Sequence, residues 1–209
     1  MDFDSLSLRA FISELGSATP VPGGGSVAAV CASFAAALAM MVSRLTPAKG
    51  TPDDSRDEMT RVCENARELA DRLLILAQED SDAYMRVIGA CRLPAQTAGE
   101  KALRKESISD ALKAAASVPM ETLRASKNLV ELAGIVLKKG NPHAITDAGA
   151  ALHLARTAAL VAAANVRINI PGIYDAVFVL ECRQAMQDCL DRIEAHFSEA
   201  VQYLESHLP

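Results

Sequence analysis

The chain has 209 residues, half of them hydrophobic and none of them Trp, and it carries a net charge of −5. This length allows one sizeable domain, and the absence of a basic run of five to eight residues argues against a nucleic-acid partner. The N-terminus lacks the basic and apolar segments of a signal peptide, and five scattered cysteines are typical of a reduced cytoplasmic protein.

Helical spacing dominates the chain, and no run of alternating β-branched residues is long enough to predict a strand. The first predicted helix covers about 5–15, with apolar residues at helical spacing. A second helix is expected over about 25–45. Its uncharged apolar stretch, 27–42, is short for a bilayer and predicts a buried helix rather than a membrane span.

The segment between these two helices, Pro20-Val-Pro-Gly-Gly-Gly-Ser26, combines two prolines with three glycines. Proline fixes φ and glycine lets the backbone approach closely, so the segment predicts a tight turn, and Ser26 is the expected N-cap of the next helix. A helix opened by glycines presents unpaired N–H groups to an anionic or electron-rich ligand. A simple hinge between two closely packed helices is the alternative interpretation.

After a loop over 47–52, the pattern predicts further helices over about 55–91, 98–117, 143–169 and 173–207. Asp53 or Asp54 is the expected cap of the third helix. Pro119 either begins a separate helix at its first turn or kinks one that continues from the fourth. Six or seven helices joined by short loops predict an all-α fold, an antiparallel up-and-down bundle of long helices in one domain over residues 1–209.

Asp80 interrupts an otherwise apolar stripe on the third predicted helix, one turn before Tyr84. A carboxylate on such a stripe is costly to bury unless it is paired or hydrated. Asp80 is therefore either a proton-transfer group with a raised pKa or the partner of a cation on a neighbouring helix, Arg104 or Arg167.

A second polar cluster, Gly140-Asn-Pro-His-Ala-Ile-Thr-Asp147, precedes the 143–169 helix. Thr146 or Asp147 is a possible helix cap. Asp147 also lies about five turns before Asn165, so both share one face of a helix made mostly of Ala, Leu and Val. These polar residues indicate either buried hydrogen bonds or a cleft. His143 and Asp147 have the spacing of metal ligands, but without a third ligand no metal site is predicted.

Several motifs occur here in the order found in the formiminotransferase-cyclodeaminase family, and the chain resembles the cyclodeaminase domain of that family over nearly its whole length. They are Thr19-Pro-Val-Pro-Gly-Gly-Gly-Ser-Val-Ala-Ala, Glu79-Asp-Ser-Asp-Ala-Tyr with Leu93-Pro94, Val118-Pro119, and Gly140-Asn-Pro-His-Ala-Ile-Thr-Asp-Ala-Gly followed by Asn165-Val-Arg-Ile-Asn169. Some small stand-alone bacterial members are methenyltetrahydrofolate cyclohydrolases. One segment departs from the family pattern: of the basic stretch that usually follows the second helix, this chain keeps only Lys49.

The resemblance implies a cytoplasmic homodimer with its site near the interface, acting on a small-molecule folate substrate without a membrane or nucleic-acid partner. The reaction would be that of a formiminotetrahydrofolate cyclodeaminase or a methenyltetrahydrofolate cyclohydrolase, and neither needs a metal or redox cofactor. In this interpretation Asp147 transfers the proton and Asp80 is a second acid/base group. The expected substrate-binding residues are Gly23, Gly24, Gly25, Ser26, Asn141 and Tyr84. The alternative is a non-catalytic helical protein that binds folate or regulates an enzyme.

Overall fold

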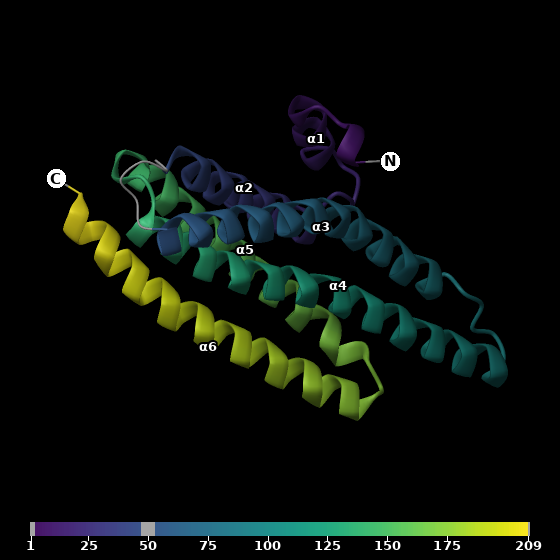
Figure 1. The fold of residues 1–209 in the computed structure, drawn as a ribbon. Helices are drawn as coiled ribbons and strands as arrows, with labels where there is room; N and C mark the ends of the chain where they lie inside the picture. Colours follow the sequence, from purple (N-terminus) through teal and green to yellow (C-terminus); the bar gives the residue numbers. More distant parts are fainter. Residues whose placement is uncertain (1–2, 47–52, 209) are drawn as a thin grey trace.

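The computed structural model describes residues 3–46 and 53–208, and these are helical almost throughout (Figure 1). A short helix, α1 (Leu8–Leu15), precedes five long ones: α2 (Gly24–Leu45), α3 (Asp53–Cys91), α4 (Ala98–Lys139), α5 (Ile145–Asn169) and α6 (Ala176–His207). Three single 3-10 turns accompany them: η1 (Phe3–Ser5), η2 (Pro142–Ala144) and η3 (Ile170–Gly172). No strand occurs in the described ranges, so the predicted all-α fold is confirmed.

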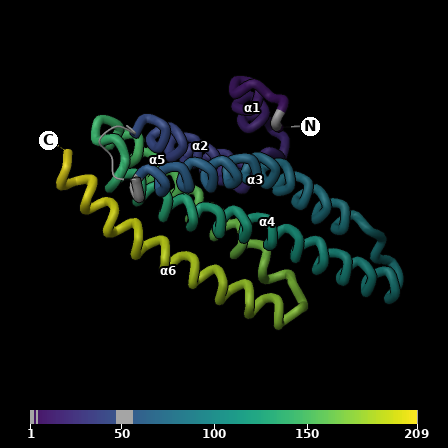
Figure 2. The backbone as a smooth tube through the Cα atoms, in the orientation of Figure 1, coloured from purple at the N-terminus to yellow at the C-terminus, as the bar shows by residue number. Residues whose placement is uncertain are grey.

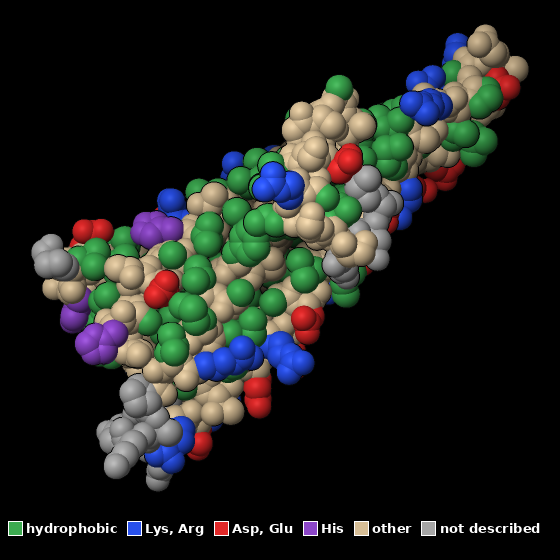
Figure 3. Space-filling view, turned by 90° about the horizontal axis from the view of Figure 1, so that it is seen from above, with side chains coloured by type: hydrophobic (Ala, Val, Ile, Leu, Met, Phe, Trp, Pro, Cys, Tyr) green, Lys and Arg blue, Asp and Glu red, His purple; other side chains and the backbone are tan. Residues whose placement is uncertain are grey.

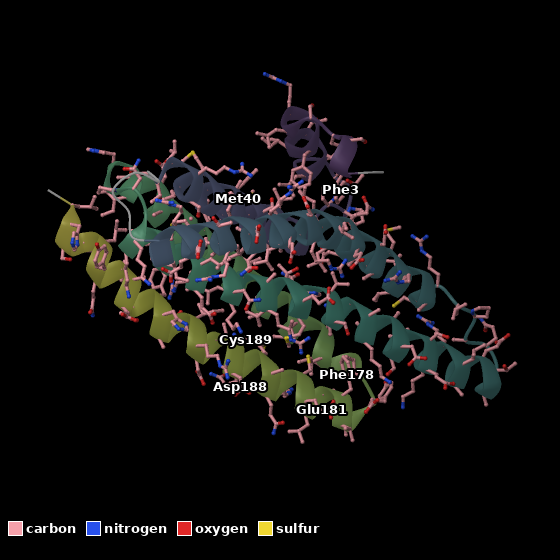
Figure 4. The ribbon with its side chains drawn as sticks, in the orientation of Figure 1. Phe3, Met40, Phe178, Glu181, Asp188 and Cys189 are labelled. Atoms are coloured by element: carbon pink, nitrogen blue, oxygen red, sulfur yellow. The ribbon has the colours of Figure 1, made fainter. Side chains whose placement is uncertain are left out.

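Helices α2 to α5 form an antiparallel bundle in which each helix packs along the next and α5 returns to α2. Helix α6 lies outside this bundle, against α4 and α5. The backbone tube in Figure 2 shows that the connected ends of α3 and α4 run beyond the other helices, while α1 stands off the bundle. Phe3 joins this N-terminal part to α3, since its N–H donates to Oε1 of Gln78 and its ring packs edge-on against Phe11 (Figure 4).

Small side chains fill the contact between α2 and α5. Buried alanines recur at helical spacing on both helices, and most have no exposed surface; they include Ala28, Ala32, Ala35 and Ala39 on α2 and Ala151, Ala155, Ala158 and Ala162 on α5. Without large side chains between them, the two backbones approach closely and form a dense layer. The start of α2 is therefore held firmly against the end of α5, which fixes the position of the glycine turn.

Of the two alternatives for Pro119, the structure has the continuous helix, because α4 runs unbroken from Ala98 to Lys139 with Pro119 inside it. An interior proline costs about 3 kcal/mol in an isolated helix. Here Pro119 is buried, and α4 packs against α3 and α5 on both sides of it, so tertiary packing offsets that cost. Thr97 and Glu100 begin the helix with a capping box.

Other predicted boundaries differ by a few residues. The first predicted helix is divided into η1 and α1, and Ser7 caps α1 by accepting from the N–H of Ala10. Helix α6 begins only at Ala176, where Asp175 accepts from the N–H of Phe178. The predicted loop over 47–52 lies outside the described residues, as do Lys49 and the capping side chains expected for α3.

By length and composition alone, two segments, Gly24–Leu45 and Pro142–Gly172, are apolar enough to cross a membrane. In the structure they face each other in the bundle, and 56% and 50% of their most apolar windows are buried. The central helices of a water-soluble bundle have the same composition, because they are buried on several sides.

Candidate functional site

The start of α2 lies directly against the carboxylate of Asp80 on α3. A Cβ added to Gly25 would lie 2.1 Å from Oδ1 and 2.5 Å from Cγ of Asp80. Any larger residue at this position would therefore displace the carboxylate. Gly23 is the N-cap and makes no side-chain capping bond. The glycines thus bring the carboxylate of a neighbouring helix to the positively polarised end of α2.

Ser26 is not the N-cap, so that prediction is wrong. It is the third residue of α2 and has no exposed surface. Its hydroxyl donates to Oδ2 of Asp80 at 3.1 Å, and its backbone N–H also donates to this carboxylate. The physical reason is that Asp80 supplies from α3 the capping acceptor that Gly23 lacks. Ser26 therefore holds Asp80 rather than the start of its own helix.

Ser81, the next residue on α3, joins this cluster and is missed by the sequence analysis. Its Oγ lies 3.1 Å from Oγ of Ser26, and only 4% of Ser81 is exposed. One feature of the sequence could have indicated it: Ser81 follows Asp80 directly and lies on the buried side of α3, between Ala77 and Ala83. A serine at such a position usually bonds to its own helix, so sequence alone does not indicate that it faces α2.

Burial raises the pKa of Asp80, and the two hydrogen bonds from Ser26 partly oppose this rise. Neither Arg104 nor Arg167 forms an ion pair with Asp80 in the described part of the chain. The neighbouring acids are engaged elsewhere, because Arg72 binds Glu79 at 2.9 Å and Gln78 donates to the exposed Asp82. A half-buried carboxyl group without a cation is typical of a proton-transfer group.

Two asparagines of α5 reach the same end of the bundle. Nδ2 of Asn165 lies 3.9 Å from the position of a Cβ on Gly24, and this glycine is exposed. Nδ2 of Asn169 donates to the carbonyls of Ala115 and Asn165, both at 2.9 Å, and so ties α5 to α4. Tyr84 is 41% exposed, one turn beyond Asp80. The structure thus brings Asp80, the glycine turn and Asn165 together.

Asn141 lies at the opposite end of α2, where it connects the turn before α5 to the end of α2. Its Nδ2 donates to the carbonyl of Leu45 at 3.0 Å, its backbone N–H donates to Thr46, and its Oδ1 accepts from the N–H of His143. These bonds use most of its hydrogen-bonding capacity. Asn141 therefore has a clear structural role in this subunit.

Asp147 also lies at this second end, half-buried in the first turn of α5. With a rise of 1.5 Å per residue, it lies about 27 Å along the helix from Asn165. The fold of this chain therefore does not bring Asp147 or Asn141 to Asp80. His143 and Asp147 gain no further ligand, since the described residues include no group of three His, Cys, Asp or Glu placed to hold a metal ion.

A groove of about 490 Å³ lies elsewhere, between α3, α4 and α6. Phe178 and Glu181 line it from α6 (Figure 4), and Arg72 binds both Glu79 and Glu121 beside it. None of the substrate-binding or catalytic residues expected from the sequence lines this groove. It is therefore distinct from the cluster around Asp80.

The sequence profile of the formiminotransferase-cyclodeaminase family matches residues 7–188. A methenyltetrahydrofolate cyclohydrolase from Methylorubrum extorquens is 35% identical over 184 residues, which cover 88% of each chain. The formimidoyltransferase-cyclodeaminase of Rattus norvegicus is 30% identical over 96% of this chain, which spans only 37% of that longer relative. The crystal structure of formiminotetrahydrofolate cyclodeaminase from Thermotoga maritima has a TM-score of 0.88 and 31% identity, covering 97% of this chain and 98% of that chain.

Proposed function

This chain belongs to the formiminotransferase-cyclodeaminase family, and we propose that it is an enzyme acting on the carbon that bridges N5 and N10 of tetrahydrofolate. Relatives of matching length carry the names of two reactions at this carbon, a cyclohydrolase and a cyclodeaminase. The observation that carries the proposal is the carboxyl group of Asp80, which is half-buried against the glycine-opened start of α2 and forms no ion pair with any described residue.

Both reactions require the same functions of the protein. A cyclodeaminase closes the ring of 5-formiminotetrahydrofolate and releases ammonia, whereas a cyclohydrolase adds water to 5,10-methenyltetrahydrofolate and gives 10-formyltetrahydrofolate. Each passes through a tetrahedral carbon, so each needs a positioned substrate, a proton-transfer group and stabilisation of charge. This chemistry requires no metal or redox cofactor, and we propose that none is used.

In this proposal Asp80 accepts and returns the proton. Burial favours its protonated form, and the bonds from Ser26 stabilise its ionised form, so both forms are accessible. Gly24 is exposed beside Asn165, and its N–H lies at the end of α2 where the helix dipole favours electron-rich groups. These two residues would hold a polar edge of the pterin or a carboxylate of the tail.

We also propose a homodimer formed through α2 and α5. Helix α2 has no charged residue before Arg44, and it exposes 46% of Phe34. Beside it on α5, Leu160 is 42% exposed and Ile168 is 76% exposed. Figure 3 shows hydrophobic side chains spread over the middle of the side on which α1 and α2 lie. Large exposed apolar surfaces of this kind commonly mark interfaces.

A twofold axis that lies in this interface and runs perpendicular to α2 would place the two subunits antiparallel, with each patch packing on its own copy. The Asp147 end of one subunit would then lie beside the Asp80 end of the other. Asp147 of the partner subunit would complete the site in each half of the dimer, and Asn141 of the partner subunit would lie close to it. This arrangement accounts for two acids at opposite ends of the bundle, since Asp147 lies about 27 Å along α5 from Asn165, at the Asp80 end.

Subunit mixing tests this dimer. Asp80→Asn and Asp147→Asn are each expected to impair both sites of a homodimer by about tenfold or more, but a mixed dimer keeps one site with both acids intact. We therefore expect turnover to rise above that of either variant when the two are unfolded and refolded together, up to about one quarter of the wild-type value for random pairing of equal amounts. No rise of turnover in a confirmed mixed dimer would contradict the shared site.

The function itself is tested with both folates on purified protein. Loss of the near-ultraviolet absorbance of 5,10-methenyltetrahydrofolate reports hydrolysis, and release of ammonia from 5-formiminotetrahydrofolate reports deamination. We expect catalysed turnover of at least one substrate, unchanged by a metal chelator. Binding of a folate without turnover would instead support the non-catalytic folate-binding protein. We further propose a cytoplasmic location without membrane attachment, consistent with five free cysteines.

A further inference from the structure

The buried serines of the described residues differ in their hydrogen-bond partners. Ser33, Ser43 and Ser126 each donate to a carbonyl of their own helix, at distances between 2.7 and 2.9 Å. This is the usual bond of a serine inside a helix. The hydroxyls of Ser26 and Ser81 are as deeply buried but lie 3.1 Å from each other, across the contact between α2 and α3.

Asp80 determines which of the two serines donates the hydrogen bond between them. An ionised carboxylate only accepts hydrogen bonds, and a hydroxyl has a single proton to donate. Since the Ser26 hydroxyl donates to Oδ2 of Asp80, the bond between the two serines must be donated by Ser81. The three groups thus form one directed chain, from Ser81 to Ser26 to Asp80.

No charged side chain in the described ranges faces the carboxylate of Asp80 and competes with this chain. The charged groups on the elements around it point outward or are paired: α2 has none before Arg44, Glu79 and Glu121 bind Arg72, Lys113 binds Asp175, Asp82 accepts from Gln78, and Arg167 is exposed. Within one chain, the hydroxyl chain is therefore the main polar control on the protonation of Asp80.

We propose that Ser81 is a positioning residue for the reaction, and that its hydroxyl aims the Ser26 hydroxyl at Asp80 and so sets the balance between the acid and base forms of Asp80. This inference rests on the proposed function, in which Asp80 moves the proton. When Asp80 takes up a proton the chain reverses: Asp80 donates to Ser26, Ser26 donates to Ser81, and the Ser81 proton turns to a carbonyl one turn back in α3. The proton that Asp80 takes up comes from the substrate, and each serine keeps its own hydroxyl proton, so no further reactant is needed.

The test is a direct titration of Asp80 without substrate, by NMR of protein labelled with ¹³C at the aspartate carboxyls. The Asp80 signal is identified by its absence in Asp80→Asn. In Ser26→Ala we expect the midpoint to move up by about one pH unit, the equivalent of one charge-assisted bond of about 1.4 kcal/mol. In Ser81→Ala we expect a rise of about 0.3 pH unit, because cooperative polarisation is a fraction of one bond.

Matched variants separate this role from general packing. Ser126→Ala removes an equally buried hydroxyl that bonds only to its own helix, and it should leave the Asp80 midpoint unchanged. Ser81→Thr keeps the hydroxyl and should restore the wild-type midpoint. If Ser81→Ala folds poorly, Ser81→Cys keeps the volume but donates weakly and should show the same rise.

A midpoint that moves by less than about 0.1 pH unit in Ser81→Ala and Ser81→Cys, against the expected 0.3, would overturn the inference. An equal rise in Ser126→Ala would also overturn it. The titration is independent of turnover: shifted midpoints in a protein that turns over neither folate would refute the proposed function alone. Unshifted midpoints in an active enzyme would refute the role of Ser81 alone.

Discussion

Polar side chains from other elements contact both ends of α2, but they have different roles at the two ends. At its start, a carboxylate from α3 lies against bare glycine backbone, receives bonds from Ser26 alone among the described residues, and has a raised pKa. At its end, Asn141 is bonded to Leu45, Thr46 and His143 and holds a turn in place. At the first end the carboxyl group of Asp80 is partly removed from water, whereas at the second end the polar groups of Asn141 are hydrogen-bonded.

This difference indicates where chemistry takes place. A carboxyl group whose burial is not balanced by a cation costs stability, and such costs concentrate at functional sites. At the second end, Asn141 is an uncharged, hydrogen-bonded side chain, so its burial has no comparable cost in stability. This end retains one half-buried acid, Asp147, which takes part in the reaction only in the dimer that we propose.

Replacing Asp80 is expected to have the largest effect on turnover. Asp80→Asn keeps the size of the side chain but cannot exchange a proton, so we expect a loss of about 10²- to 10⁴-fold. The variant should also be more stable at neutral pH, because a folded-state pKa above the unfolded value means that stability is lost as pH rises through it. Asp82→Asn, at an exposed acid on the same helix, is the control and should change neither property.

Gly25→Ala tests whether the close contact between the α2 backbone and Asp80 matters for turnover. Its new Cβ would push the Asp80 carboxylate away from Ser26, and a displacement of about 1 Å can cost up to about 10²-fold in rate. We expect a tenfold to hundredfold loss of turnover. Gly89→Ala is the control, because nothing lies within 4 Å of a Cβ at that position. Full activity of Gly25→Ala would show that the position of Asp80 is unimportant.

Asp147→Asn tests whether the second end takes part in the reaction. If Asp147 of the partner subunit reaches the substrate, turnover should fall by about tenfold or more, equivalent to about 1.4 kcal/mol. Gel filtration of the variant checks that the dimer is intact. Turnover within about threefold of wild type, a loss below about 1 kcal/mol, would remove Asp147 from the mechanism.

Asn141→Ala is expected to affect stability more than chemistry. The variant loses the bonds to Leu45 and His143, at about 0.5–1.5 kcal/mol each. For a chain of this length the melting temperature should fall by roughly 2–12 °C, as measured by thermal unfolding followed by circular dichroism. An unchanged melting temperature would mean that this turn is held by other contacts.

The fold was largely predictable from the sequence, because the helices follow apolar periodicity and their loops carry Pro and Gly. Pro119 was ambiguous, since packing against α3 and α5, which sequence does not display, decides whether a helix continues through a proline. Asp80 could be identified because a carboxylate on an apolar stripe is rare. Asp147 and Asn165 do share one helix. Their separation along it shows that Asp147 lies far from the glycine turn only once the structure places Asn165 beside Gly24.

The cluster itself could be predicted only in part. Ser26 follows three glycines and fits the pattern of an N-cap, yet the acceptor on Asp80, 54 residues away, determines where its hydroxyl points. Ser81 gives no signal of its own, because its partner lies on another helix. Contacts between helices, rather than local sequence, assemble the group that we assign to proton transfer.

The pH dependence of kcat/KM, measured for the wild type and for the residual activity of Asp80→Asn, tests the assignment of Asp80 most directly. We predict that one limb of the wild-type profile reports a carboxyl group with a pKa above the ordinary range of aspartate, and that this limb disappears in Asp80→Asn. The same limb in both proteins, with turnover of the variant near that of wild type, would contradict the account.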